Sequence, residues 1–169
     1  MTRQPFIPMA FDIPERLATP RLQLRPLTIH DLDADYDAVM SSIEHLRETM
    51  PFGPSHDWPN SALSRDQNLI DLGWHQKEFQ NRTSFAYTVT APDDSQCLGC
   101  LYIYPSGKKD HDAEILMWVR SSEAGTGLDD HLFTAVQEWI RDQWPFTAPA
   151  YPGRTLSWQE WDRLPPCAE

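Results

Sequence analysis

The stretch that decides the fold runs from Asp112 to Ile140 and reads DAEILMWVRSSEAGTGLDDHLFTAVQEWI. Its first part, Ala113–Val119, is a short apolar run of strand length, and its last part, Leu128–Ile140, repeats apolar residues at helical spacing. A tight turn, Gly125-Thr126-Gly127, separates them. Such a turn is a potential anion site, because unpaired backbone N–H groups and the positive end of a helix converge there. A plain strand–turn–helix connection is the alternative.

Composition indicates one folded domain over residues 1–169, since 40% of the chain is hydrophobic and 11% aromatic. Lys and Arg number 14 against 25 Asp and Glu, which gives a net charge of −11. This charge argues against a nucleic-acid partner, because phosphate binding needs a cationic surface. It favours attraction of cationic amines, polyamines or basic peptides.

The chain shows no run of membrane-span length and no signal-peptide pattern at its start, so we expect a cytoplasmic protein that binds no membrane. Cys97 and Cys100 form a C-x-x-C pattern inside a predicted strand. Positions three apart in a strand point to opposite faces. We therefore interpret the pair as two reduced thiols and predict no metal site.

The remaining pattern predicts an irregular arm over residues 1–16 and an atypical short segment over residues 145–169. Capping boxes at Thr28 and Ser157, and the pair of Ser64 and Gln67, predict three helix starts. The helix that starts at Thr28 is expected to run to about Met50, and the one that starts at Ser64 to about Asn81. Alternating apolar and polar residues predict a strand at Leu17–Leu27, and a high content of aromatic and β-branched residues predicts strands at Ser84–Thr90 and Gln96–Tyr104. A further short strand is expected around Thr147–Tyr151.

Two stretches resemble the GNAT superfamily of N-acetyltransferases, in the branch that acetylates ribosomal-protein N-termini. The run Ala113–Val119 is similar to that branch's A-E-I-G-Y-W-L strand, and Gly125 and Gly127 match two glycines of its R-G-x-G-x-G/A loop. Ala124 stands at the arginine position and Asp129 at the last small position. The pattern L-x-T-x-R-L-x-L-R-x-L, completed by an aspartate, is matched by Leu17, Thr19, Arg21, Leu22, Leu24, Arg25, Leu27 and Asp31.

The resemblance implies an α+β fold, with a mixed, mostly antiparallel sheet and helices on both faces. The strands at Ala113–Val119 and Thr147–Tyr151 should run parallel and splay apart at the glycine turn. The family's last two strands have no sequence here to form them. An open sheet edge of that kind would favour a homodimer.

The implied reaction is acetyl transfer from acetyl-CoA to a primary amine of a small molecule or peptide. By resemblance, backbone groups of Met117, Trp118 and Val119 would bind the pantetheine arm, and the pyrophosphate would bind at Gly125, Thr126, Gly127, Leu128 and Asp129. Glu114 is the candidate general base, and the alternative is a structural glutamate paired with Arg21, Arg25 or Lys108. Tyr102, Tyr104 and Tyr151 are available as proton donors.

The acceptor loop of the resembling family falls on Phe52, His56 and Trp58, where simple burial of the loop is the alternative. Asp129 and Asp130 should repel a pyrophosphate, so Asp129→Gly should tighten CoA binding at least about tenfold. The alternative function is a non-catalytic module of the same fold that binds an acyl-CoA, another ligand or a protein partner.

Overall fold

A computed structural model of the chain describes residues 5–51 and 57–167. Within these residues the sheet has six strands in the order β1 to β6, antiparallel throughout except for the parallel pair β5–β6. The strands are β1 (Leu17–Ala18), β2 (Gln23–Pro26), β3 (Phe85–Thr90), β4 (Cys97–Pro105), β5 (Ala113–Val119) and β6 (Pro149–Ala150). The predicted mixed sheet and its parallel pair are confirmed.

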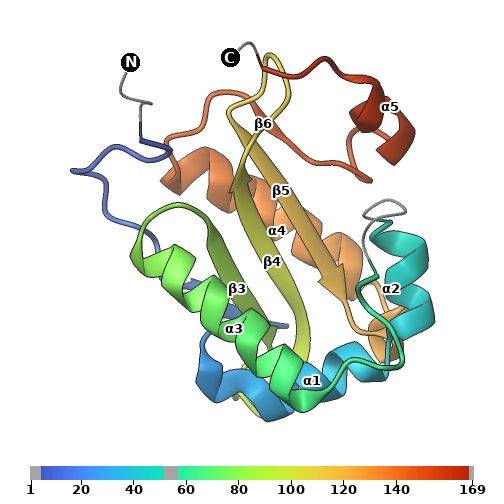
Figure 1. Ribbon diagram of the computed structural model, residues 1–169. Helices are drawn as coiled ribbons and strands as arrows, with labels where there is room; N and C mark the ends of the chain where they lie inside the picture. The colour runs from blue at the N-terminus through green and yellow to red at the C-terminus, as the bar shows by residue number, and fades with distance from the viewer. Residues whose placement is uncertain (1–4, 52–56, 168–169) are drawn as a thin grey trace.

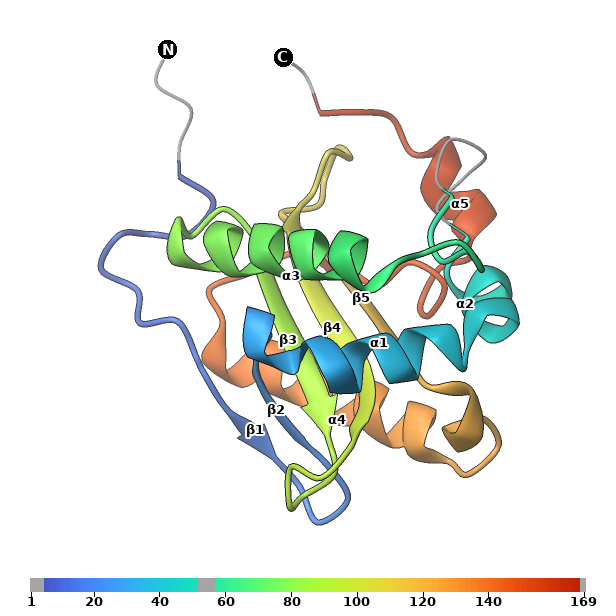
Figure 2. The same cartoon turned by 60° about the horizontal axis from the view of Figure 1, so that its bottom comes forward.

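The helices are α1 (Leu32–Met40), α2 (Ile43–Thr49), α3 (Arg65–Gln80), α4 (Leu128–Gln143) and α5 (Trp158–Arg163). Figures 1 and 2 show α1 and α3 across one face of the sheet and α4 across the other, as expected. On α4 the residues at helical spacing are the buried ones, and the helix ends just before Pro145. No helix of the described ranges is both long and apolar enough to span a bilayer.

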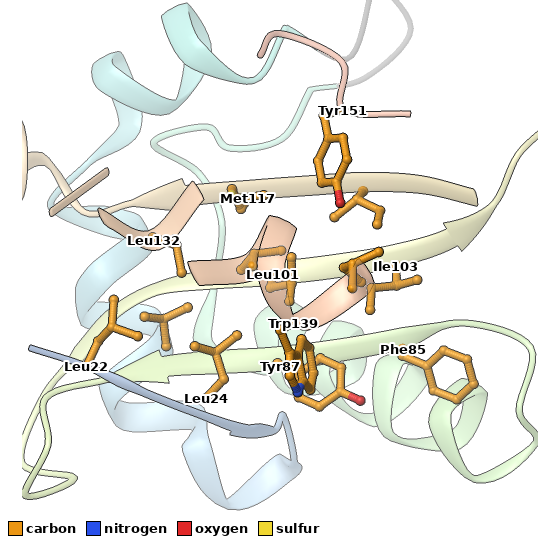
Figure 3. Close-up of a cluster of buried hydrophobic side chains, with 14 of the residues drawn as sticks. Leu22, Leu24, Phe85, Tyr87, Leu101, Ile103, Met117, Leu132, Trp139 and Tyr151 are labelled. Atoms are coloured by element: carbon orange, nitrogen blue, oxygen red, sulfur yellow. The ribbon is translucent and has the colours of Figure 1, made fainter. Parts of the chain in front are cut away.

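The core lies in two layers, one on each face of the sheet. Figure 3 shows the layer beneath α4, to which the strands contribute residues such as Leu24, Tyr87 and Leu101. The second layer, under α1 and α3, includes Tyr102 and Trp118. Because side chains alternate along a strand, the odd-numbered residues of β5 pack toward α4, whereas the even-numbered ones face α1 and α3. This alternation decides which face receives the side chains of the candidate site.

The strands β4 and β5 approach each other closely at Gly99. A Cβ added there would lie 1.9 Å from the carbonyl oxygen of Trp118, a distance that no side chain permits. Glycine at this position is therefore a condition for the pairing of the two central strands.

Two predicted elements are interrupted. The capping box of Thr28 and Asp31 forms, but it starts a short 3₁₀ turn, and the helix that follows stops at Met40 before α2 begins. The reason lies at Ser41 and Ser42, whose hydroxyl oxygens accept hydrogen bonds from Arg120 and from the Ser121 N–H. The run Leu17–Leu27 is also not one strand, because a turn at residues 19–22 folds it into the β1–β2 hairpin.

The prediction that Cys97 and Cys100 point to opposite faces is wrong. Val89 pairs with Gly99 while Thr90 pairs with Cys97, so a β-bulge adds one residue to β4 and turns both thiols to the α1 side. There the two sulfur atoms and a carboxylate oxygen of Asp35 lie within 4.8 Å of one another.

Candidate active site

The glycine turn leads β5 into α4 with both glycines in the left-handed region, at φ +82° each. The first helical hydrogen bond joins the His131 N–H to the Gly127 carbonyl, so the N–H groups of the three residues before His131 have no carbonyl partner one turn back. A Cβ added at Gly125 would meet no atom within 4 Å. Open space therefore borders the turn at Gly125, as a phosphate cradle requires, while the Thr126 N–H already donates to the Glu123 carbonyl oxygen and the Leu128 N–H to Thr126 Oγ1.

The edge of β5 beyond Glu114 has lost its strand partner. The β5–β6 ladder consists of two residue pairs, Ala113 with Pro149 and Glu114 with Ala150, after which the strands separate. Beyond that point, side chains contact backbone carbonyl groups of β5. The Met117 oxygen accepts a hydrogen bond from Arg154 Nη2 at 3.0 Å, and His45 Nε2 lies 3.1 Å from the Val119 oxygen. A ligand that bonds to these two oxygen atoms in place of the side chains must displace both of them.

Arg154 also forms a two-pronged ion pair with Asp129, and Nη2 lies 2.9 Å from Oδ1. Its guanidinium lies over the ring of Phe133, 5.6 Å from the ring centre. Arg154 belongs to a tight turn over residues 151–156, in which the Gly153 N–H donates to the Leu156 carbonyl at 2.8 Å. Arg154 therefore compensates the charge of Asp129. The expected repulsion between Asp129 and a pyrophosphate did not take this partner into account.

A second cation reaches the glycine turn from the β1–β2 hairpin. Arg21 donates from Nη2 to the Thr126 carbonyl oxygen at 3.3 Å, and its Nη1 would lie 3.8 Å from a Cβ added at Gly127. Ala124 leaves the turn without the family's arginine, and Arg21 places a guanidinium beside the same amides.

On the α1–α3 face, a cavity of about 500 Å³ lies against β4 and β5. Apolar and aromatic side chains dominate its walls, together with three carboxylates. The lining residues are Leu27, Asp35, Trp58, Asn68, Asp71, Leu72, Trp74, His75, Tyr102, Tyr104, Glu114 and Leu116. Concave, largely apolar sites with a few convergent polar groups are typical of small-molecule binding.

Glu114 enters this cavity from β5, opposite Tyr104 on β4. Burial raises the pKa of Glu114, and the positive charge of Lys108 acts in the opposite direction. The ammonium of Lys108 donates to the carbonyls of Asp162 and Leu164. Arg25 pairs with Asp31 and Asp94, and no ion pair joins Glu114 to a cation in the described part of the chain. A half-buried carboxyl with a raised pKa fits a general base.

The three candidate tyrosines divide between the two faces. Tyr102 and Tyr104 line the cavity with ring centres 6.0 Å apart, and burial raises the pKa of both phenols. The Tyr102 oxygen accepts from Trp118 Nε1 at 3.1 Å. Tyr151 packs on the α4 face against Phe133, where burial raises its pKa to about 12. The phenols that stay protonated beside Glu114 are therefore Tyr102 and Tyr104.

The predicted acceptor loop is described in part. Trp58 lines the cavity and lies 6.3 Å from Trp118, ring centre to ring centre, whereas Phe52 and His56 lie outside the described residues. At the opposite end of the cavity, Asp35 accepts from Asn68 Nδ2 at 2.9 Å and from the thiol of Cys100 at 3.5 Å. These neutral donors satisfy the buried carboxyl, and desolvation raises its pKa.

Sequence reasoning missed side chains that act at the β5 edge or in the cavity, among them Arg154, His45 and Asp71. None stands in a motif that points to these positions. The contacts join segments far apart in the chain, and a local pattern carries no signal for them.

The sequence model of the acetyltransferase (GNAT) domain matches residues 21–158. No curated protein matches the chain. The ribosomal-protein-S5-alanine acetyltransferase from Vibrio fischeri has a similar structure, with 14% identity, a TM-score of 0.58 and coverage of 76% of this chain and 67% of that one. The ribosomal L7/L12 alpha-N-protein acetyltransferase RimL in complex with coenzyme A is 18% identical, with a TM-score of 0.60 and coverage of 76% and 70%. The microcin C7 self-immunity acetyltransferase MccE, solved with acetyl-CoA and AMP, is 12% identical, with a TM-score of 0.57 and coverage of 72% and 63%.

Proposed function

The chain belongs to the GNAT acetyltransferase family, and we propose that it transfers the acetyl group of acetyl-CoA to a primary amine of a small molecule or a peptide. The observation that carries the proposal is the position of Glu114. Its side chain enters the cavity from the strand that continues directly into the glycine turn, so one segment bears both a candidate base and a candidate phosphate cradle.

The chemistry requires an amine nitrogen without its extra proton and a proton for the thiolate that departs when the C–S bond breaks. Glu114 would take the proton of the acceptor ammonium directly or through one water. Tyr104, opposite it on β4, would donate the second proton, since burial keeps its phenol protonated at neutral pH. Tyr102 is the alternative donor from the same wall.

Co-substrate binding would use the backbone N–H groups of the glycine turn for the pyrophosphate, with Arg21 as a nearby cation. The pantetheine arm would bond to the Met117 and Val119 backbone after Arg154 and His45 withdraw. Both contacts come from side chains, so their withdrawal breaks one contact to each carbonyl and leaves the backbone of β5 in place. Met117, Val119, Gly125, Thr126, Gly127, Leu128 and Asp129 thus remain the proposed cofactor residues, with Trp118 between them.

The test compares Glu114→Gln with wild type in an acetyl-transfer assay over short amines, diamines and peptides with free N-termini. We expect kcat to fall about 10²–10⁴-fold with unchanged acetyl-CoA affinity. Glu138→Gln, an exposed carboxylate on α4, is the matched control and should turn over like wild type. Wild-type turnover by a folded Glu114→Gln variant would remove Glu114 from this role.

A second candidate function, a non-catalytic acyl-CoA-binding or partner-binding module, is favoured by the side chains that already occupy the β5 edge. Calorimetric titration with acetyl-CoA followed by the amine panel separates the two. Binding without turnover of any amine supports the module, and turnover supports the enzyme. A homodimer through the β6 edge stays a prediction that light scattering tests.

A further inference from the structure

Acidic groups line the cavity beside Glu114 without a cationic counterpart among the described residues, and burial raises the pKa of each carboxyl. Its ionisable lining consists of the carboxyl groups of Asp35, Asp71 and Glu114 together with His75, the two tyrosines being neutral, and no lysine or arginine from the described ranges lines it. Burial lowers the pKa of His75 to about 4, so its ring is uncharged at neutral pH. Buried or half-buried carboxylates without a cation attract a positively charged ligand.

The carboxylates differ in what already bonds to them. Asp35 is held by Asn68 and Cys100, as described above. Asp71 accepts from Gln67 at Oδ1, 3.1 Å away, and no donor from the described residues reaches its Oδ2. Asp71 and Glu114 are therefore the two carboxylates best placed to bind a ligand cation.

Their spacing follows from the elements that carry them. Asp71 lies one turn of α3 before His75, about 6 Å along the helix, and the His75 ring stacks on Tyr102. Tyr104, opposite Glu114, lies two residues further along β4, about 7 Å away. The two carboxylates thus reach the cavity from different elements, each offset by several ångströms from the stacked pair of His75 and Tyr102. A ligand that contacts both therefore needs two cationic groups joined by a chain.

The walls between these carboxylates suit such a chain. Leu72 and Leu116 offer apolar surface to methylene groups, and the rings of Trp58 and Trp74 offer aromatic faces that attract ammonium groups. We propose that the acceptor is a linear aliphatic diamine, whose reacting amino group lies at Glu114 while its second ammonium binds Asp71. This inference rests on the proposed function and names the substrate class of that same site.

The test measures kcat/KM for 1,4-diaminobutane and 1,5-diaminopentane against n-butylamine and n-pentylamine, with saturating acetyl-CoA. We expect the diamines to exceed the monoamines of equal length by at least about tenfold, because each charged hydrogen bond contributes about a decade or more. Asp71→Asn should lower kcat/KM for diamines about tenfold, mainly through KM, and change the monoamine values less than about twofold. Asp66→Asn removes the same charge from an exposed position of α3 and is the matched control.

Equal rates for diamines and monoamines would overturn the inference, and so would equal effects of Asp71→Asn and Asp66→Asn in proteins with wild-type circular dichroism. If free peptide N-termini are acetylated and diamines are not, the proposed substrate class is wrong and the proposed function stands. Absence of transfer to every amine tested would overturn both, because the proposed function would then have failed at its first step.

Discussion

The ion pair of Asp129 and Arg154 sets the charge beside the glycine turn. Neutralising Asp129 should therefore raise the affinity for acetyl-CoA, and neutralising Arg154 should lower it. In the wild type the two charges largely cancel. Asp129→Asn leaves an uncompensated guanidinium near the phosphate cradle, whereas Arg154→Gln leaves an uncompensated carboxylate.

The magnitude follows from Coulomb's law. At about 6 Å and an effective dielectric constant of about 20, one unit charge changes the energy of a phosphate charge by roughly 3 kcal/mol. Salt screening at a partly exposed site reduces this to about half, which is close to a factor of ten in Kd. We expect Asp129→Asn to bind acetyl-CoA about tenfold more tightly, Arg154→Gln about tenfold more weakly, and the double variant within about threefold of wild type. Asp129→Gly should also bind more tightly, with lower thermal stability because glycine weakens the first turn of α4.

The assay is calorimetric titration with acetyl-CoA at low and moderate salt, where the two single variants should converge as salt rises. Arg141→Gln and Asp142→Asn are matched controls, because this exposed pair lies at the other end of α4. Tighter binding by Arg154→Gln would refute the reasoning and identify the guanidinium as an obstacle at the Met117 carbonyl. If no variant gives a binding signal at millimolar acetyl-CoA, the proposed function loses its co-substrate.

Two further predictions concern stability. Burial raises the folded-state pKa of Asp35 above its unfolded value of about 3.9, so the charged form opposes folding, and stability due to this group is lost as pH rises. The free energy of unfolding of Asp35→Asn, measured by urea titration and compared with that of wild type, should therefore increase from about pH 4 upward, by at most about 1.4 kcal/mol per pH unit. A difference between the two proteins that does not change with pH would contradict this. Gly99→Ala should cost about 3 kcal/mol or more in the same titrations, because its Cβ meets the Trp118 backbone. Gly107→Ala, whose Cβ meets nothing within 4 Å, is the control, and equal losses would exclude the steric explanation.

Local patterns predicted the central elements of this fold well. The strand β5 begins and ends where its apolar run does, and the capping boxes at Thr28 and Ser157 both form. Each of these depends on residues within a few positions of one another, so the sequence itself contains the interaction.

Features that depend on distant segments escaped prediction. The bulge that turns Cys97 toward Cys100 comes from the pairing of β4 with β3, and the break after Met40 comes from contacts with Arg120 and Ser121. In the site, Arg154 meets Asp129 across 25 positions of sequence. From the sequence, Asp129 in the first turn of α4 was therefore expected to repel a pyrophosphate. Arg154, which compensates its charge, belongs to another part of the chain.

The segment from β6 to Cys167 is held at both of its ends, and this has a kinetic consequence. At one end Pro149 and Ala150 pair with β5, and at the other Pro165 and Cys167 bond to the backbone of the 107–109 loop. Opening of the 151–156 turn at the β5 edge, once Arg154 releases the Met117 carbonyl, would leave both ends in place, so the chain entropy released would be that of a short closed loop. Entry of acetyl-CoA would then be timed by this local opening: the observed association rate should level off at high ligand concentration, at the rate at which the 151–156 turn opens.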